Sequence, residues 1–152
     1  MKHTYNLKLR HPSKSPVADF PVVTLCGSTR FKSEFEAVCR DLTCDGYIVI
    51  TVGLFGHADG EFDSGFITPE LKRRLDLMHF AKISMSDAIY VINPGGYIGE
   101  SIKREITYAR MNDIPVNFMD KERGPKFSES NGLRDRAFAD LRRFIAGEAP
   151  EA

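Results

Sequence analysis

The chain has 152 residues, the size of one ordinary domain, and 42% of them are hydrophobic, which suffices for a substantial buried core. The 21 basic and 21 acidic residues give a net charge of zero, which argues against a polymeric nucleic-acid partner because such binding needs a basic field. No apolar run approaches the ~20 residues of a membrane span, and residues 1–20 lack the apolar segment of a signal peptide. The three cysteines lack C-x-x-C spacing, which favours a reducing, cytoplasmic environment over disulfides.

Apolar runs and helical periodicity alternate along residues 21–147, which we take as one domain. Strands are expected in short, β-branched runs over residues 21–26, 47–52, 87–92 and 114–119. Helices are expected where apolar residues recur with helical spacing, over residues 31–45, 68–86, 99–112 and 133–146. Residues 1–20 are interpreted as an N-terminal tail or extension, and residues 148–152 as a C-terminal tail.

This alternation of strand and helix predicts an α/β fold with a parallel sheet. Right-handed crossovers restrict the topology, and we expect a single-domain, flavodoxin- or Rossmann-like three-layer sandwich with strand order 2-1-3-4, a fifth strand being allowed. In that order the first and third strands are neighbours, and ligands bind in the crevice where the strand order reverses. Gly46 suits the position after a helix, and Thr68-Pro69 suits the start of one.

The loop after the first expected strand reads Cys26-Gly27-Ser28-Thr29-Arg30. Glycine lets the backbone approach a ligand, and the N-terminus of the following helix attracts anions. The hydroxyl groups can bond phosphate oxygens, which the guanidinium group can also bind through two donors. We therefore predict that Cys26, Gly27, Ser28 and Arg30 bind substrate, although the serine or threonine would serve equally well as a helix N-cap.

A second glycine-rich loop, residues 93–99, follows the third expected strand and leads into a helix. Gly96 and Gly99 suit the close approach of a sugar or an anion, and Glu100 and Ser101 begin the helix. We expect all four residues to contact substrate. The simpler alternative is a flexible glycine-rich helix start, at which the helix dipole favours an acidic residue such as Glu100.

Glu105 is the predicted catalytic residue because it lies one helical turn after Ser101, on the same face. From there its carboxylate can attack an anomeric carbon or stabilise an oxocarbenium ion, the alternative being a surface ion pair with a neighbouring cation. His79 is the second catalytic candidate, as an acid, a base or a positioning group, and it shares a helix face with Lys82. The simpler alternative is a partly buried histidine on an amphipathic helix. No two histidines have metal-ligand spacing, so we expect neither a metal nor another cofactor.

The loop at residues 53–67 contains four glycines and is long enough to be a functional segment. Its aromatic residues Phe55, Phe62 and Phe66 can stack on a nucleobase or fill a hydrophobic cluster beneath the loop. We expect Phe55 or Phe62 to cover a base, and His57 to touch the substrate as part of a lid.

At these residues the chain resembles the nucleoside 2-deoxyribosyltransferase superfamily, which includes the 2′-deoxynucleoside 5′-phosphate N-hydrolases. The likeness spans roughly residues 22–118 and rests on the Cys-Gly-Ser-Thr-Arg loop, the run Ala88-Ile89-Tyr90-Val91-Ile92, and Glu105-Ile106-Thr107-Tyr108-Ala109. The resemblance implies that Glu105 is a catalytic nucleophile and that the first loop holds the sugar-phosphate. It also implies a homodimer or a higher homo-oligomer.

The chain departs from the superfamily pattern in three places. His79 stands where the family usually carries an aspartate, Ser86 replaces an alanine, and Gly99-Glu100-Ser101 replaces a serine-x-glycine spacing. The family's aspartate helps to orient or protonate the leaving base, a role that would fall here to His79.

A second resemblance, to the cytokinin-activating phosphoribohydrolases, rests on the Cys-Gly-Ser loop and on Pro94-Gly95-Gly96, where Ile98 interrupts the family motif. We expect an enzyme that cleaves the N-glycosidic bond of a nucleoside or a (deoxy)nucleoside 5′-monophosphate through Glu105, by hydrolysis or by base transfer. The alternatives are a cytokinin-activating-type nucleotide phosphoribohydrolase and a non-catalytic nucleotide sensor on the same fold.

Overall fold

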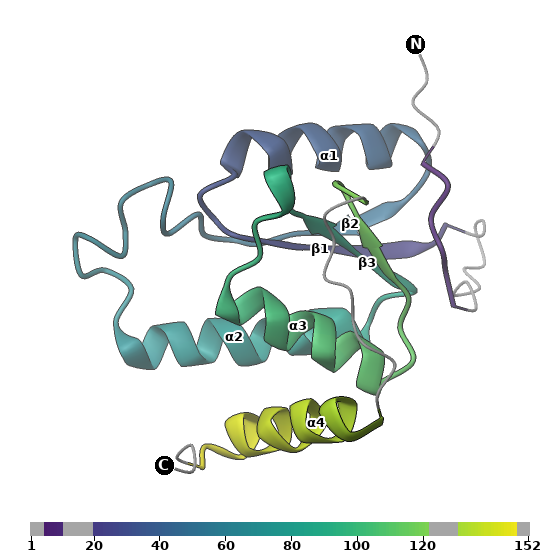
Figure 1. The fold of residues 1–152 in the computed structure, drawn as a ribbon. Helices are drawn as coiled ribbons and strands as arrows, with labels where there is room; N and C mark the ends of the chain where they lie inside the picture. The colour runs from purple at the N-terminus through teal and green to yellow at the C-terminus, as the bar shows by residue number, and fades with distance from the viewer. Residues whose placement is uncertain (1–4, 11–19, 122–130, 149–152) are drawn as a thin grey trace.

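The computed structural model describes residues 5–10, 20–121 and 131–148 (Figure 1). Strands and helices alternate along these residues, as predicted, and their ends lie within two residues of the expected ones. In chain order the elements are β1 (Val22–Gly27), α1 (Lys32–Cys44), β2 (Ile48–Ile50), α2 (Pro69–Ser84), β3 (Ala88–Ile92), the 3-10 turn η1 (Pro94–Gly96), α3 (Glu100–Met111), β4 (Val116–Phe118) and α4 (Asn131–Ala146).

The strands form one parallel sheet in the order β2-β1-β3-β4, which confirms the predicted topology. Val23 pairs with Ala88 and Gly27 pairs with Ile92, so β1 and β3 end side by side at one edge of the sheet. The described part of the chain contributes no fifth strand. The strand order reverses between β1 and β3, and this is where parallel α/β sheets bind their ligands.

Helices cover both faces of the sheet (Figure 1). One face packs against α1 through the α1 cluster, which consists of Val23, Leu25, Phe35, Val38, Leu42, Tyr90 and Ile92. The other face packs against α2 and α3 through the α2–α3 cluster, which consists of Cys26, Phe80, Ile83, Ile89, Val91, Ile102, Ile106, Ala109, Ile114 and Leu141. α4 lies against α3 and supplies the last of these residues. The arrangement is the expected three-layer sandwich with one additional outer helix.

Residues 5–10, expected as part of a tail or an extension, pack on the α1 side of the sheet. The Tyr5 ring meets the Tyr90 ring edge-on, with 5.7 Å between their centroids. The backbone N–H of Lys8 donates to Oδ1 of Asn117 at 2.9 Å, which ties the segment to β4. This part of the N-terminal region is therefore an extension that covers the sheet.

Two turn signals in the sequence are confirmed. Gly46 follows α1 with a φ of +92°, and the N–H of Tyr47 bonds the carbonyl of Leu42, as in a Schellman C-cap. Thr68 is the N-cap of α2, where its hydroxyl oxygen accepts a backbone hydrogen bond at 3.2 Å, and Pro69 occupies the first helical position. These local signals place the two helices that flank the crevice.

β2 is shorter than the expected strand over residues 47–52 because the flanking backbone groups have other partners. The N–H of Tyr47 caps α1, as described above. The carbonyl of Thr51 accepts a hydrogen bond from Nζ of Lys82 at 2.9 Å. This second bond joins α2 to the loop after β2.

Candidate active site

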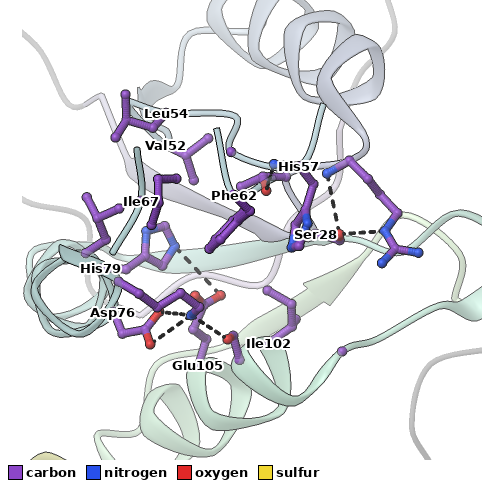
Figure 2. Close-up of a pocket in the computed structure, with 18 of the residues that line it drawn as sticks. Ser28, Val52, Leu54, His57, Phe62, Ile67, Asp76, His79, Ile102 and Glu105 are labelled. Atoms are coloured by element: carbon purple, nitrogen blue, oxygen red, sulfur yellow. Dashed lines mark hydrogen bonds and ion pairs between the residues drawn. The ribbon is translucent and has the colours of Figure 1, made fainter. Parts of the chain in front are cut away.

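A pocket of about 330 Å³ opens at the carboxyl ends of β1 and β3, where the ligand crevice was predicted. Its walls come from the loop after β1, the loop after β2, one side of α2 and the first turns of α3, and Figure 2 shows these side chains converging. Ten residues that were predicted to contact or act on the substrate line it: Gly27, Ser28, Arg30, His57, Phe62, His79, Gly99, Glu100, Ser101 and Glu105.

The loop after β1 gives the pocket a polar wall. Gly27 has a φ of +154°, and a Cβ atom there would lie 2.7 Å from the carbonyl oxygen of Ile92, so a larger residue does not fit. Oγ of Ser28 accepts a hydrogen bond from Nε of Arg30 at 3.1 Å. The N-cap of α1 is Phe31, which makes no side-chain capping bond. The serine and threonine of the loop therefore do not act as the N-cap, and the anion-attracting helix start lies beside this wall.

Arg30 joins the two glycine-containing loops. Its guanidinium carbon lies 4.4 Å from the centroid of the Tyr97 ring, a cation–π contact. Phe31 packs edge-on against the same ring, at 5.9 Å between centroids. Arg30 and Tyr97 both line the pocket, so the loop after β3 reaches the polar wall through an aromatic ring.

The residues in and after the β3 loop that were predicted to contact substrate have different positions relative to the pocket. Gly96 lies in η1 with a φ of +84° and does not line the pocket, so its glycine is explained by the turn and the prediction of substrate contact is corrected. Gly99 is the N-cap of α3 and lines the pocket. Glu100 lies at the rim, where its exposed carboxylate pairs with Lys103 at 3.0 Å. The helix-start alternative therefore describes Glu100 well.

The two aromatic candidates in the loop at residues 53–67 also have different places. Phe62 lines the pocket and stacks on His57, with 4.5 Å between ring centroids. Phe55 instead packs edge-on against Phe35 at 5.5 Å, beside the α1 cluster. Phe55 therefore packs on the core beneath the loop, and of these two rings only that of Phe62 lines the pocket.

Glu105 lies in the pocket wall with only 8% of its surface exposed. Burial raises the pKa of its carboxyl group to about 8, against the opposing effects of a hydrogen bond with the Cys26 thiol and of the Lys72 and Lys82 charges. Its Oε2 atom has no hydrogen-bond partner among the described residues. The surface ion pair considered for this residue is excluded, and a buried carboxyl group with a shifted pKa in a pocket indicates a functional site.

His79 and Cys26 surround this carboxyl group. Nε2 of His79 lies 3.8 Å from Oε2 of Glu105 and 3.5 Å from Sγ of Cys26. Burial, together with the Lys82 charge, lowers the pKa of His79 to about 4, so the ring is neutral at neutral pH. Cys26 is fully buried and lies behind the residues that line the pocket. Its predicted contact with substrate is thus corrected to a contact with the catalytic candidates, and burial raises the pKa of its thiol.

Two pocket residues of α2, Lys72 and Asp76, were not predicted. Nζ of Lys72 donates to Oδ1 of Asp76 at 2.8 Å and to Oγ of Ser101 at 3.1 Å, which bridges α2 and α3 (Figure 2). Asp76 precedes His79 by three residues, about one helical turn. The pocket therefore contains an aspartate close to His79, the position at which the superfamily that the chain resembles usually has an aspartate. The helical spacing of Lys72, Asp76 and His79 was the signal that could have identified this face.

No protein-family model matches this chain, and comparisons with curated proteins and with solved structures also return no match. Within the described ranges, no helix combines the length and the apolar character needed to cross a membrane. The superfamily resemblance therefore stays a prediction, and function is argued from the side chains of the site.

Proposed function

We propose that the protein cleaves the N-glycosidic bond of a nucleoside or a nucleoside 5′-monophosphate, with Glu105 as the nucleophile. The observation that carries this proposal is the buried carboxyl group of Glu105, whose Oε2 has no hydrogen-bond partner within the described structure. The group faces a pocket of about 330 Å³, which is the size of a small-molecule site.

Desolvation of Glu105 favours this reaction because it penalises the free carboxylate more than the transition state. Positive charge develops on the sugar ring as the C1′–N bond breaks, and a carboxylate without bound water stabilises that charge strongly. An oxygen of Glu105 bonds to C1′ while the base leaves with the electron pair of the broken bond and takes up a proton. Attack of water on the resulting ester gives hydrolysis, and attack of a second base gives transfer.

The other lining groups suit the remaining parts of such a substrate. Ser28 and Arg30, beside the start of α1, offer donors and positive charge to a 5′-phosphate. The stacked rings of Phe62 and His57 offer a flat surface to a base. Ser101 shares the pocket face of α3 with Glu105 and offers its hydroxyl group to the sugar.

His79 is assigned a positioning role beside Glu105. A general acid must hold a proton near the working pH, and a histidine with a pKa of about 4 is neutral there. The ring nevertheless lies 3.8 Å from Oε2 of Glu105, where it restricts the carboxyl group. Lys72 and Asp76 are further polar groups of α2 that line the pocket and can orient a base or a water molecule.

The proposal predicts a specific pH dependence. Attack on C1′ requires the ionised carboxylate, and burial raises the pKa of Glu105 to about 8. We therefore expect kcat/KM for an uncharged nucleoside, measured with a metal chelator present, to rise with pH and to level off above that value. A profile that is already flat from about pH 5 upward would contradict the role of this carboxylate.

The experiment is a panel of ribo- and deoxyribonucleoside 5′-monophosphates and their parent nucleosides, with free base measured by chromatography. Glu105→Ala is run in parallel, and Glu36→Gln serves as the control because Glu36 is exposed on α1 and does not line the pocket. A second base is added to half of the samples to detect transfer. We expect base release by the wild type and by Glu36→Gln, and none by Glu105→Ala.

Chemical rescue sharpens this test. Azide is small enough to enter the space left in Glu105→Ala, and its attack on C1′ should restore base release and yield a glycosyl azide. Turnover near the wild-type level in Glu105→Ala would sink the proposal. Calorimetric binding of a nucleotide without release of base from any compound would support the sensor instead.

A further inference from the structure

Cys26, His79 and Glu105 come from β1, α2 and α3, and their side chains meet where His79 and Glu105 line the pocket, with Cys26 directly behind them. One potential ligand atom from each residue lies within 4.8 Å of the other two. All three residues are buried, with exposures of 0%, 6% and 8%. We propose that they form a binding site for Zn²⁺ or a chemically similar transition-metal ion, with the remaining coordination position open to the pocket.

The spacing of the ligand atoms suits tetrahedral zinc. Bonds of about 2.3 Å to sulfur and about 2.0–2.1 Å to imidazole nitrogen place the two ligand atoms about 3.5 Å apart at the tetrahedral angle. Sγ of Cys26 and Nε2 of His79 are 3.5 Å apart. Oε2 of Glu105 lies 3.8 Å from the same nitrogen, and a small rotation of the glutamate side chain brings it to the shorter separation of a bound carboxylate.

The donor set selects the class of ion. Thiolate and imidazole ligands favour zinc and its neighbours, whereas magnesium and calcium prefer oxygen ligands. Three protein ligands with one open position are the pattern of zinc sites that bind exogenous groups. The charges of the Cys26 thiolate and the Glu105 carboxylate together balance a divalent cation, so the loaded site buries no net charge.

Independent observations point to a missing partner at this place. The Glu105 side chain is only 10% exposed, and its Oε2 has no hydrogen-bond partner among the described residues. A buried polar atom of this kind is costly unless something binds it. The neighbouring ring of His79 places Nε2, an atom type that commonly ligates metals, 3.8 Å from this oxygen. The ammonium group of the nearby Lys82 already donates a hydrogen bond to the carbonyl oxygen of Thr51 at 2.9 Å.

Occupation of the site removes Glu105 from the reaction. A carboxylate that ligates an ion does not attack C1′, so Zn²⁺ acts as a reversible inhibitor of glycosidic cleavage. This consequence rests on the proposed function, whereas binding of the ion does not. The same side chain thus has two mutually exclusive uses.

The direct test is a titration of the chelator-treated full-length protein with Co²⁺, whose absorption reports thiolate ligation and tetrahedral geometry without any substrate. We expect one equivalent to bind and to produce a thiolate-to-metal charge-transfer band. Cys26→Ser should lose the band, whereas Cys44→Ser, which changes an exposed cysteine, should keep it. Glu105→Gln should weaken binding at least about tenfold. Circular dichroism shows that each variant is folded, and His79→Gln replaces Cys26→Ser if the latter does not fold.

Absence of the band in the wild type, or its persistence in Cys26→Ser, overturns the metal site. Zinc added to an active preparation should abolish base release near one equivalent, and a chelator should restore it. Activity that persists with the site loaded overturns the inhibitory role. A band that depends on Cys26 in a protein that releases no base from any nucleotide supports the metal site and counts against the proposed function alone.

Discussion

The two faces of the sheet use the same strands for different purposes. The α1 cluster consists of aliphatic and aromatic side chains. The α2–α3 cluster meets, at its pocket end, the ionisable groups of Cys26, His79 and Glu105. Side chains alternate along a strand, so Leu25 enters the first cluster and Cys26 enters the second. A single step along β1 therefore separates an apolar face from a face that carries buried ionisable groups.

This difference has an energetic consequence, because the pocket face buries an ionisable group. Burial of an aliphatic side chain contributes about 1.5–3 kcal/mol, whereas burial of a carboxyl group is unfavourable unless the group becomes neutral. The raised pKa of Glu105, about 8, reflects this unfavourable free energy of burying the carboxylate. Functional sites commonly reduce stability in this way. Substitutions in the α1 cluster should therefore lower stability and leave activity unchanged, whereas substitution of Glu105 should lower activity and raise stability near neutral pH.

The largest expected effect is the loss of activity in Glu105→Gln. The amide is close to the carboxyl group in shape but does not attack C1′, so kcat/KM should fall by about 10³-fold or more. Release of base from the best substrate of the panel measures this, and thermal unfolding shows that the variant is folded. A fall in kcat/KM of less than about tenfold would show that the buried carboxyl group is not the nucleophile.

Leu42→Ala tests the other face. Leu42 is fully buried in the α1 cluster and does not line the pocket. Removal of its side chain should lower the free energy of unfolding by about 2–5 kcal/mol, because it leaves a cavity. Urea denaturation measures this, and kcat/KM per folded molecule should stay unchanged. A parallel loss of kcat/KM in the folded protein would show that the faces are coupled.

Glu105→Gln should also change stability, with a sign that depends on pH. The folded-state pKa of about 8 lies above the ordinary value of 4.5, so the wild type loses stability as pH rises between these values, by at most about 1.4 kcal/mol per pH unit from this group. The glutamine variant lacks this loss. Its stability relative to the wild type should therefore grow from near zero at acidic pH to a few kcal/mol near pH 8. Urea denaturation across this range is the measurement, and a constant difference would contradict the raised pKa.

Thr68→Ala should have the smallest effect. The substitution removes the N-cap hydrogen bond of α2, whose 3.2 Å length is ordinary, and should cost about 1 kcal/mol of stability. Thr68→Ser keeps the hydroxyl oxygen and is the control. Thermal unfolding of both variants measures the difference. Equal stability of the two variants would mean that the cap does not stabilise α2, the helix that carries His79.

Most of the fold could be predicted because its signals are local. Gly46 and Thr68 mark helix ends through their own backbone preferences, and the alternation of strand and helix restricts the strand order. The ends of β2 could not be predicted, since they depend on the Thr51 carbonyl meeting Lys82 from a distant helix. Tertiary partners thus changed the lengths of elements while leaving their order as expected.

The site was predictable only where its residues share one element. The spacing of Ser101 and Glu105 places both on one face of α3, and both line the pocket. Spacing does not tell Phe55 from Phe62, because packing against Phe35 decides which ring turns into the core. Histidine spacing likewise could not predict that Cys26 and His79 lie close together, because they are 53 residues apart in sequence.

The loop at residues 53–67 meets the polar wall through groups that are easily separated. The N–H of His57 donates to Oγ1 of Thr29 at 3.2 Å, and Asp59 pairs with Lys32 at 3.0 Å in an exposed ion pair. Exposed contacts of this kind add little to stability. The base of the loop is held more firmly, since a Cβ atom at Gly56 would lie 2.5 Å from the Ile67 side chain. Any opening of this loop would therefore cost least at its outer part, because its base is packed against the Ile67 side chain.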